Sequence, residues 1–355
     1  MVPWVTGPKS PNTTLGRFTI SGTDLGIAWD NGSQQTLLAF GDTFGWCNVE
    51  GHQWRNNVLL RTDDDDPSDG LTITPGIPGD SKSGAVVTAA APAYATEMIR
   101  AMKADFVEVT TIPTAGISIG TGAGAKQYVN FMSVRHWGSA GVWDTNFSMT
   151  AVSADNGQTW TPELSTMRVN APLTMALPDE APTVNVNNRF FQQSGYVRGH
   201  GADDAYIYQV GTPNGRFGNA YLARFHPDDI LDLSKYEYWL GNSWTSDLGA
   251  LSETGSAIVT GNISELSVAW SEYLGKYVML DGDNGIRIRT ATTMSGPWSA
   301  PKMLVPDGRV VLYGPMMLPQ SPALTSKTDN RLYFNGSQWS DYNMMLVESK
   351  LQSSW

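Results

Sequence analysis

Cysteine is almost absent from this sequence of 355 residues, which contains only Cys47. A single cysteine cannot form an intrachain disulfide, and it excludes a zinc site built from several cysteines. The four histidines, His52, His136, His200 and His226, are dispersed and form no H-E-x-x-H pair. We therefore expect neither a metal ion nor another cofactor.

Charge is also scarce, because only 16% of the residues are Asp, Glu, Lys or Arg. This argues against disorder and coiled coil. The balance is acidic, with 34 acids, 23 bases and a net charge of −11, so a nucleic-acid partner is not expected. No stretch approaches the roughly 18 apolar residues of a membrane span. The segment 1–8 lacks the pattern of a signal peptide. The expected location is extracellular, after loss of a signal, or on a virion such as a phage tail.

What the chain does contain is short strands separated by turns rich in glycine. Its 36 glycines and 20 prolines disfavour long helices. Apolar alternation over 22–29, an Asn-Gly turn and the run 35–40 predict a β-hairpin. Similar hairpin patterns recur, which gives about five clusters of antiparallel strands. This repetition indicates an all-β fold, a five-bladed β-propeller.

Several features refine this prediction. The segment 153–160, Ser-Ala-Asp-Asn-Gly-Gln-Thr-Trp, fits the Asp-box of propeller hairpins, in which the aspartate shapes a turn. Short helical insertions are predicted at 93–106 and at 226–236. We expect a strap or linker over 1–15 and a single catalytic propeller domain over 16–355.

Two aspartates of the first hairpin suit the cleavage of a glycosidic bond, which needs a pair of carboxyl groups. Asp24 lies on the small, polar face of its strand, and Asp42 ends the next strand. With a three-residue loop, residue 24 would pair with residue 40. Asp42 would then lie diagonally on the same face, roughly 7–8 Å away. A two-residue loop would separate the faces unless Gly41 forms a bulge. The alternative is that each aspartate only caps a turn.

Five further residues are candidates for substrate contacts. Glu265 shares a strand face with small residues, Trp143 offers a ring for stacking on a sugar, and Asn146 follows it closely. Arg55 and Asn57 come soon after Asp42, and the Arg55 guanidinium could lower the pKa of a neighbouring carboxyl group. For Trp143 and Asn146 the alternative is core packing, and for Glu265 it is an ordinary position on a strand surface.

The chain resembles the endo-D-arabinanases, five-bladed propeller glycoside hydrolases that were once catalogued as a domain of unknown function. The resemblance rests on Gly-Thr-Asp-Leu-Gly at 22–26, Gly-Asp-Thr-Phe at 41–44 and Arg-Asn-Asn-Val-Leu at 55–59, and it spans roughly residues 15–350. It implies hydrolysis of internal α-D-arabinofuranosyl bonds in mycobacterial arabinogalactan and lipoarabinomannan, with Asp24 and Asp42 as the catalytic pair. Members occur in actinobacteria and on the tails of their phages, which adds other virion tail proteins to the expected partners.

Three alternatives stay open on the sequence. The first is a non-catalytic glycan-binding propeller, such as a phage tail adhesin. The second is a sialidase-like hydrolase, which the Asp-box suggests, although the arginine cluster needed to bind a substrate carboxylate is not evident. The third is a structural scaffold that binds no glycan.

Overall fold

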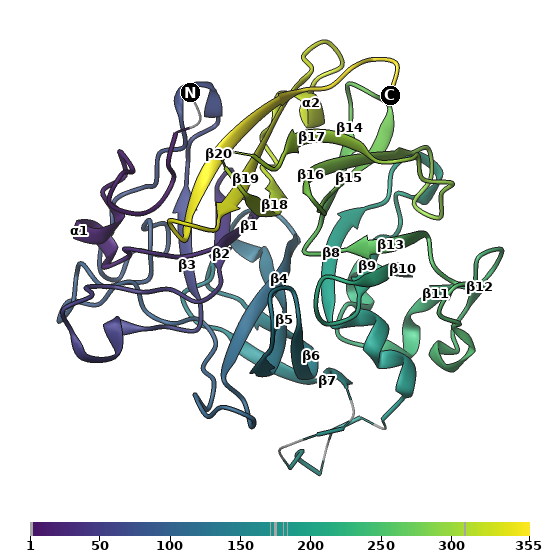
Figure 1. Ribbon diagram of the computed structural model, residues 1–355, viewed down its shortest axis with the longest axis horizontal. Coiled ribbons are helices and arrows are strands. Elements are labelled where there is room, and N and C mark those ends of the chain that lie inside the picture. The colour runs from purple at the N-terminus through teal and green to yellow at the C-terminus, as the bar shows by residue number, and fades with distance from the viewer. Residues whose placement is uncertain (1–2, 171, 174–175, 180, 183, 309) are drawn as a thin grey trace.

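The computed structural model describes residues 3–170, 172–173, 176–179, 181–182, 184–308 and 310–355. Its five antiparallel sheets are arranged around one axis (Figure 1). This confirms the five-bladed β-propeller. The inner strands of the blades, β1, β4, β8, β14 and β18, contact one another in a closed ring.

The strands of each blade follow one another in the chain. Blades one and two are β1 (Leu25–Asp30), β2 (Thr36–Phe40) and β3 (Val58–Thr62), then β4 (Thr110–Ile119), β5 (Lys126–Trp137), β6 (Trp143–Ser153) and β7 (Thr161–Val169). Blade three is β8 (Gln193–Arg198), β9 (Ile207–Thr212), β10 (Gly218–Phe225), β11 (Glu237–Trp239) and β12 (Trp244–Thr245), with β13 (Val259–Ile263) paired to β10. Blades four and five are β14 (Ser267–Ser271), β15 (Lys276–Gly282), β16 (Gly285–Ala291) and β17 (Lys302–Pro306), then β18 (Leu312–Met317), β19 (Arg331–Gln338) and β20 (Asn343–Lys350).

The helices are all short. They are α1 (Thr14–Phe18), α2 (Pro322–Thr325) and the 3-10 turns Glu50–Gln53, Pro67–Asp69, Gly122–Gly124, Val186–Phe191, Gly201–Asp203, Pro227–Asp229, Leu233–Lys235 and Leu248–Ala250. No helix among the described residues has the length and apolarity to cross a membrane. The insertion predicted at 226–236 contains two of the 3-10 turns, Pro227–Asp229 and Leu233–Lys235.

The helix predicted over 93–106 is wrong. The backbone of this segment bonds to distant segments instead of to its own preceding turn. The amides of Ala95 and Thr96 donate to the carbonyls of Phe18 and Val86, at 3.0 and 2.9 Å. Partners elsewhere in the fold thus outweigh the helix propensity of these residues.

The apolar core lies between the blades. Strand β2 shows why, because Leu37 and Ala39 pack toward blade two whereas Leu38 and Phe40 pack toward blade five. Successive side chains of a strand point to opposite faces, and both faces of β2 are covered by a neighbouring blade. Equivalent clusters join the other neighbouring blades.

The N-terminal segment pairs with the last strand of blade five. Trp4 forms a bridge with Met345 of β20, and the Val5 amide donates to the Met344 carbonyl at 2.9 Å. Trp4 and Val5, within the segment predicted as a strap or linker, therefore lie beside the last strand (Figure 1).

The Asp-box lies between β6 and β7 and is structural, as its sequence indicates. Asp155 accepts hydrogen bonds from the Thr159 amide at 2.9 Å and from the Thr159 hydroxyl at 2.6 Å. The Trp160 ring meets the Trp29 ring edge to face, with their centroids 6.5 Å apart. The motif therefore joins blade two to blade one.

Candidate active site

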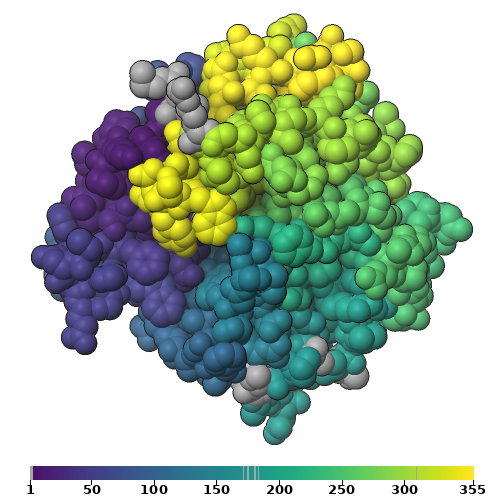
Figure 2. Space-filling view, in the orientation of Figure 1, coloured from purple at the N-terminus to yellow at the C-terminus, as the bar shows by residue number. Residues whose placement is uncertain are grey.

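A cavity of about 290 Å³ opens where the inner strands begin. Its charged and aromatic lining residues are Asp24, Asp42, Trp137, Trp143, Arg216, Glu265, Tyr313, Trp339 and Tyr342. The β5–β6 loop, blue-green in Figure 2, and the yellow β19–β20 loop both line it and flank the centre of the ring. The cavity thus collects side chains from all five blades.

Asp24 reaches the cavity because of a bulge at the start of β1. Neither loop length considered from the sequence occurs, because Asp30 pairs with Thr36 and residues 31–35 form the loop. Leu25 pairs with Phe40, and the register shifts at Gly26 instead of at Gly41. The Leu25 amide donates to Ser337 Oγ at 2.8 Å, and the Gly26 carbonyl accepts from Asn335 Nδ2 at 2.9 Å. Blade five therefore holds the bulge that positions Asp24.

A glycine is required opposite this aspartate. A Cβ atom at position 41 would lie 2.5 Å from Asp24 Oδ1, closer than real Cβ atoms come to a neighbour. The Gly41 amide also donates to the Asp24 carbonyl at 3.2 Å. Gly41 thus lets the two segments approach closely enough for both aspartates to line one cavity.

The carboxyl group of Asp24 has few hydrogen-bond donors. Tyr313 Oη donates to Oδ2 at 2.9 Å, while Oδ1 is buried and has no partner among the described residues. Burial, followed by the negative charge of Asp42, raises the pKa of Asp24 from 3.8 to about 7. The Tyr313 hydrogen bond opposes this rise only in part. Near neutral pH this carboxyl group can therefore hold and release a proton.

Asp42 is better supplied with donors. Trp54 Nε1 and Thr110 Oγ1 donate to its Oδ1 at 2.8 and 2.7 Å. Burial raises the pKa of Asp42 to about 6, although these two hydrogen bonds lower it. Since both donors stabilise the carboxylate, Asp42 ionises at a lower pH than Asp24.

Glu265 lies on another wall of the cavity, paired with Arg216. The guanidinium contacts both carboxylate oxygens, with Nη2 to Oε1 at 2.7 Å and Nε to Oε2 at 3.0 Å. Burial lowers the pKa of Arg216, but the charge and the hydrogen bond of Glu265, together with Tyr313 and Asp24, outweigh burial, so the net pKa is raised. The two charges neutralise each other, and the guanidinium also lies 4.8 Å from the Tyr313 ring centroid and 5.1 Å from that of Trp339.

Comparison with known proteins identifies the family of this chain. A family model described as "Domain of unknown function (DUF4185)" matches residues 9–348. The chain belongs to the DUF4185 family. This DUF4185 chain is also 28% identical over 341 residues to the notoamide biosynthesis cluster protein J of Aspergillus sp. (strain MF297-2), covering 91% of this chain and 81% of that protein.

Solved structures share the fold of this DUF4185 chain at low sequence identity. A protein of Bacteroides ovatus ATCC 8483 with a provisional hydrolase assignment has a TM-score of 0.57 at 14% identity, covering 97% of this chain and 89% of its own. An exo-β-1,3-galactanase of Phanerochaete chrysosporium has a TM-score of 0.50 at 10% identity. That match covers 100% of this chain and 64% of the galactanase. These likenesses establish the fold.

Of the residues predicted from the DUF4185 sequence, Asp24, Asp42, Trp143 and Glu265 line the cavity together. Trp143 is 5% exposed and packs in the cluster between blades one and two, so it serves the core as well. Its indole Nε1 is buried with no partner in the described part of the chain. That atom is a free hydrogen-bond donor in the cavity wall.

The other three predicted contacts, Arg55, Asn57 and Asn146, are buried outside the cavity lining. Arg55 donates to backbone carbonyls, including Ala95 O at 2.9 Å. Asn57 donates to the Thr111 carbonyl at 2.8 Å, and Asn146 donates to the Val107 carbonyl at 2.7 Å. Their polar groups satisfy irregular backbone, because buried carbonyls need donors. The structure therefore does not place these three side chains in the cavity, where contacts with a sugar are expected.

The sequence reasoning missed four residues of the site, namely Arg216, Tyr313, Trp339 and Tyr342. Arg216 lies in a Pro-Asn-Gly-Arg turn whose polar character was visible, but nothing local connects that turn to Asp24. The two tyrosines and Trp339 come from blade five, 289 to 318 residues after Asp24. Only closure of the ring brings them to it.

No group of three or more His, Cys, Asp or Glu side chains in the described part of the chain is arranged to hold a metal ion. The chemistry available in the cavity is that of two carboxyl groups, one guanidinium–carboxylate pair and several aromatic rings.

Proposed function

We propose that this chain is a glycoside hydrolase that cleaves internal α-D-arabinofuranosyl linkages of mycobacterial-type cell-wall arabinan, in arabinogalactan and lipoarabinomannan. One observation carries the proposal. Asp24 and Asp42 line the same cavity, and their pKa values are raised to about 7 and about 6. Between these values Asp24 holds a proton while Asp42 is ionised, which is the division of roles that glycosidic hydrolysis requires.

In this proposal Asp24 is the general acid. It gives its proton to the glycosidic oxygen as the bond from that oxygen to the anomeric carbon breaks. In one course Asp42 takes a proton from the water that attacks this carbon, which inverts its configuration. In the other, Asp42 attacks the carbon and forms a covalent glycosyl-enzyme, and water deprotonated by Asp24 then displaces Asp42, so the two inversions retain the configuration. NMR of the first product anomers distinguishes the two courses.

The lining of the cavity favours an uncharged sugar chain. Among the described residues that line the cavity, Arg216 carries the positive charge, and Glu265 neutralises it. A sialidase needs guanidinium groups that are free to bind the substrate carboxylate, and this described lining offers none. Exposed aromatic rings continue beyond the cavity. Trp137 and Trp339 on its rim are 40% and 46% exposed, and Phe217, beside Gly141 of the rim, is 63% exposed. Such rings suit stacking on sugars along a polymer.

The choice of arabinan rests on the resemblance of segments 22–26, 41–44 and 55–59 to the endo-D-arabinanases. The shared fold of the galactanase adds support for carbohydrate hydrolysis in general. Because this substrate surrounds bacterial cells, the proposal includes action outside the producing cell, free or on a phage tail together with other tail proteins.

The test is incubation with purified mycobacterial arabinogalactan, followed by sizing of the products. We expect a ladder of arabino-oligosaccharides from the wild type and at least about 10²-fold less product from Asp24→Asn or Asp42→Asn. Asp228→Asn, an exposed aspartate outside the cavity, is the matched control and should keep full activity. The rate should follow a bell-shaped pH curve with limbs near 6 and 7. Wild-type amounts of product from both cavity variants would refute the assignment of the pair.

The exposed rim aromatics also favour a second candidate, a glycan-binding propeller without catalysis. It predicts that arabinan in the gel slows the wild type and Asp24→Asn equally in affinity electrophoresis. Neither protein should release product, even after long incubation.

A further inference from the structure

A second and larger cavity lies at the opposite face of the propeller, where the inner strands end. Its volume is about 760 Å³. It shares Thr114, Leu266 and Met316 with the first cavity, so these three side chains separate the two ends of one axial channel. The candidate catalytic aspartates do not line it. Whatever enters this cavity therefore meets a different set of groups.

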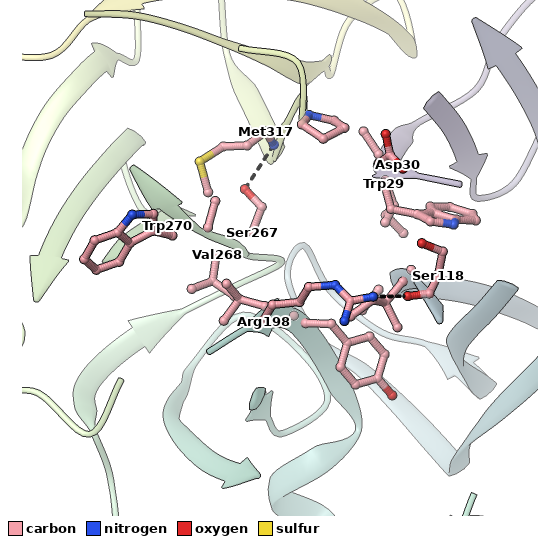
Figure 3. A pocket seen from close by; sticks show the side chains of 18 of the residues that line it. Trp29, Asp30, Ser118, Arg198, Ser267, Val268, Trp270 and Met317 are labelled. Atoms are coloured by element: carbon pink, nitrogen blue, oxygen red, sulfur yellow. Dashed lines mark hydrogen bonds between the residues drawn. The ribbon is translucent and has the colours of Figure 1, made fainter. Parts of the chain in front are cut away.

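The walls of the second cavity are largely apolar. Trp29 and Trp270 lie on opposite sides of it (Figure 3), and Val268 and Met317 also belong to its lining. The Trp270 ring is stacked on His200, with their centroids 3.9 Å apart. A space of this size with aromatic and aliphatic walls falls within the range of small-molecule sites, about 300–1,000 Å³.

One cation projects into this apolar space. Arg198, at the end of β8, extends toward Ser118 of β4, whose carbonyl accepts a hydrogen bond from Nη2 at 2.6 Å (Figure 3). The guanidinium forms no ion pair with any carboxylate of the described residues, although the protein as a whole has a net charge of −11. A guanidinium has five N–H donors, so four of them are left for a ligand.

Asp30 supplies the carboxylate of this lining, and it forms no ion pair with Arg198. The Asp30 carboxylate faces the β1–β2 loop, where its Oδ1 accepts a hydrogen bond from the Gly32 amide at 2.6 Å. His200 is held in the stack on Trp270. The lining thus combines one unpaired cation with apolar walls, a combination complementary to an anion with an apolar body.

We propose that this cavity binds an organic carboxylate with an apolar body about the size of one or two rings. Arg198 would hold the carboxylate through two parallel N–H···O bonds. The apolar body would lie between the Trp29 and Trp270 walls. The site is distinct from the candidate catalytic cavity, and binding there does not depend on hydrolysis.

The test is calorimetric titration of the full chain with 2-naphthoate, and with 2-naphthalenemethanol as its uncharged counterpart. We expect 2-naphthoate to bind one site and the alcohol to bind at least about tenfold more weakly. Arg198→Gln should weaken naphthoate binding at least about tenfold. Arg198 is exposed and makes one hydrogen bond, so this variant should fold.

Two controls locate the site. Arg100→Gln removes an exposed arginine outside the cavity, and Trp339→Ala changes the rim of the catalytic cavity, so both should bind naphthoate as the wild type does. Equal binding of naphthoate and the alcohol, unchanged affinity of Arg198→Gln, or no binding at millimolar concentration would overturn the proposal. Displacement of naphthoate by an equal concentration of inorganic phosphate would overturn the role of the apolar body.

Discussion

The substitution Asp24→Asn should stabilise the protein while it lowers the activity, because burial makes the ionised form of Asp24 unfavourable. Burial and the Asp42 charge raise its pKa from 3.8 to about 7. The amide of asparagine has nearly the same shape, carries no charge at any pH, and its oxygen can still accept the Tyr313 hydroxyl. The substitution therefore removes the charge and keeps the packing.

The magnitude follows from linkage between folding and proton binding. Between pH 4 and pH 7 the folded chain holds a proton on Asp24 that the unfolded chain has released, so stability falls as the pH rises. A rise of about three pKa units at about 1.4 kcal/mol each gives a penalty of about 4 kcal/mol above pH 7. The gain in free energy of unfolding from Asp24→Asn should thus be near zero at pH 4 and about 4 kcal/mol at pH 8.

Urea denaturation of both proteins at pH 4, 6 and 8 measures this difference. Asp42 is present in both, so its own titration largely cancels. Activity on arabinogalactan should fall by about 10²–10⁴-fold, the usual worth of a general acid. A stability difference that is the same at pH 4 and pH 8 would refute the reasoning, since Asp24 would then titrate normally.

Three further substitutions test other parts of the site. Tyr313→Phe removes a hydrogen bond that lowers the pKa of Asp24, so the high-pH limb of kcat/KM should move up by about one unit, and an unmoved limb would contradict this. Glu265→Gln leaves the Arg216 charge buried without its partner and should lower the free energy of unfolding by about 3 kcal/mol in urea, whereas a loss below about 1 kcal/mol would show that the pair matters little. Asn57→Ala should lower stability by about 3 kcal/mol without changing KM, because its bonds go to backbone, and a raised KM would restore it as a substrate contact.

Local signals predicted the elements well where those signals decide the structure. The Asn-Gly turn and apolar alternation placed β1 and β2, and the Asp-box placed the turn between β6 and β7. They failed at 93–106, where the composition suits a helix but the Asn57 side chain accepts hydrogen bonds from the amides of Met98 and Ile99. A local pattern carries no information about such a distant partner.

The same limit explains the candidate site. Arg55 and Asn57 are polar, like Asp24 and Asp42, and follow the same hairpin in the sequence of blade one. Arg55 and Asn57, however, are buried, and their side chains donate hydrogen bonds to backbone carbonyls. Asp24 and Asp42 line the cavity instead.

The sequence by itself determined the five groups of strands, the all-β class and the two aspartates at the ends of the first hairpin strands. The tertiary structure alone decided the register at Gly26 and the pKa values of the two carboxyl groups. It also alone decided that Arg216 and Tyr313 lie in the same cavity as Asp24. The physical reason is closure of the ring. Blade five supplies the hydrogen bonds that hold the bulge and the side chains that surround Asp24, and it adjoins blade one only when the whole propeller has formed.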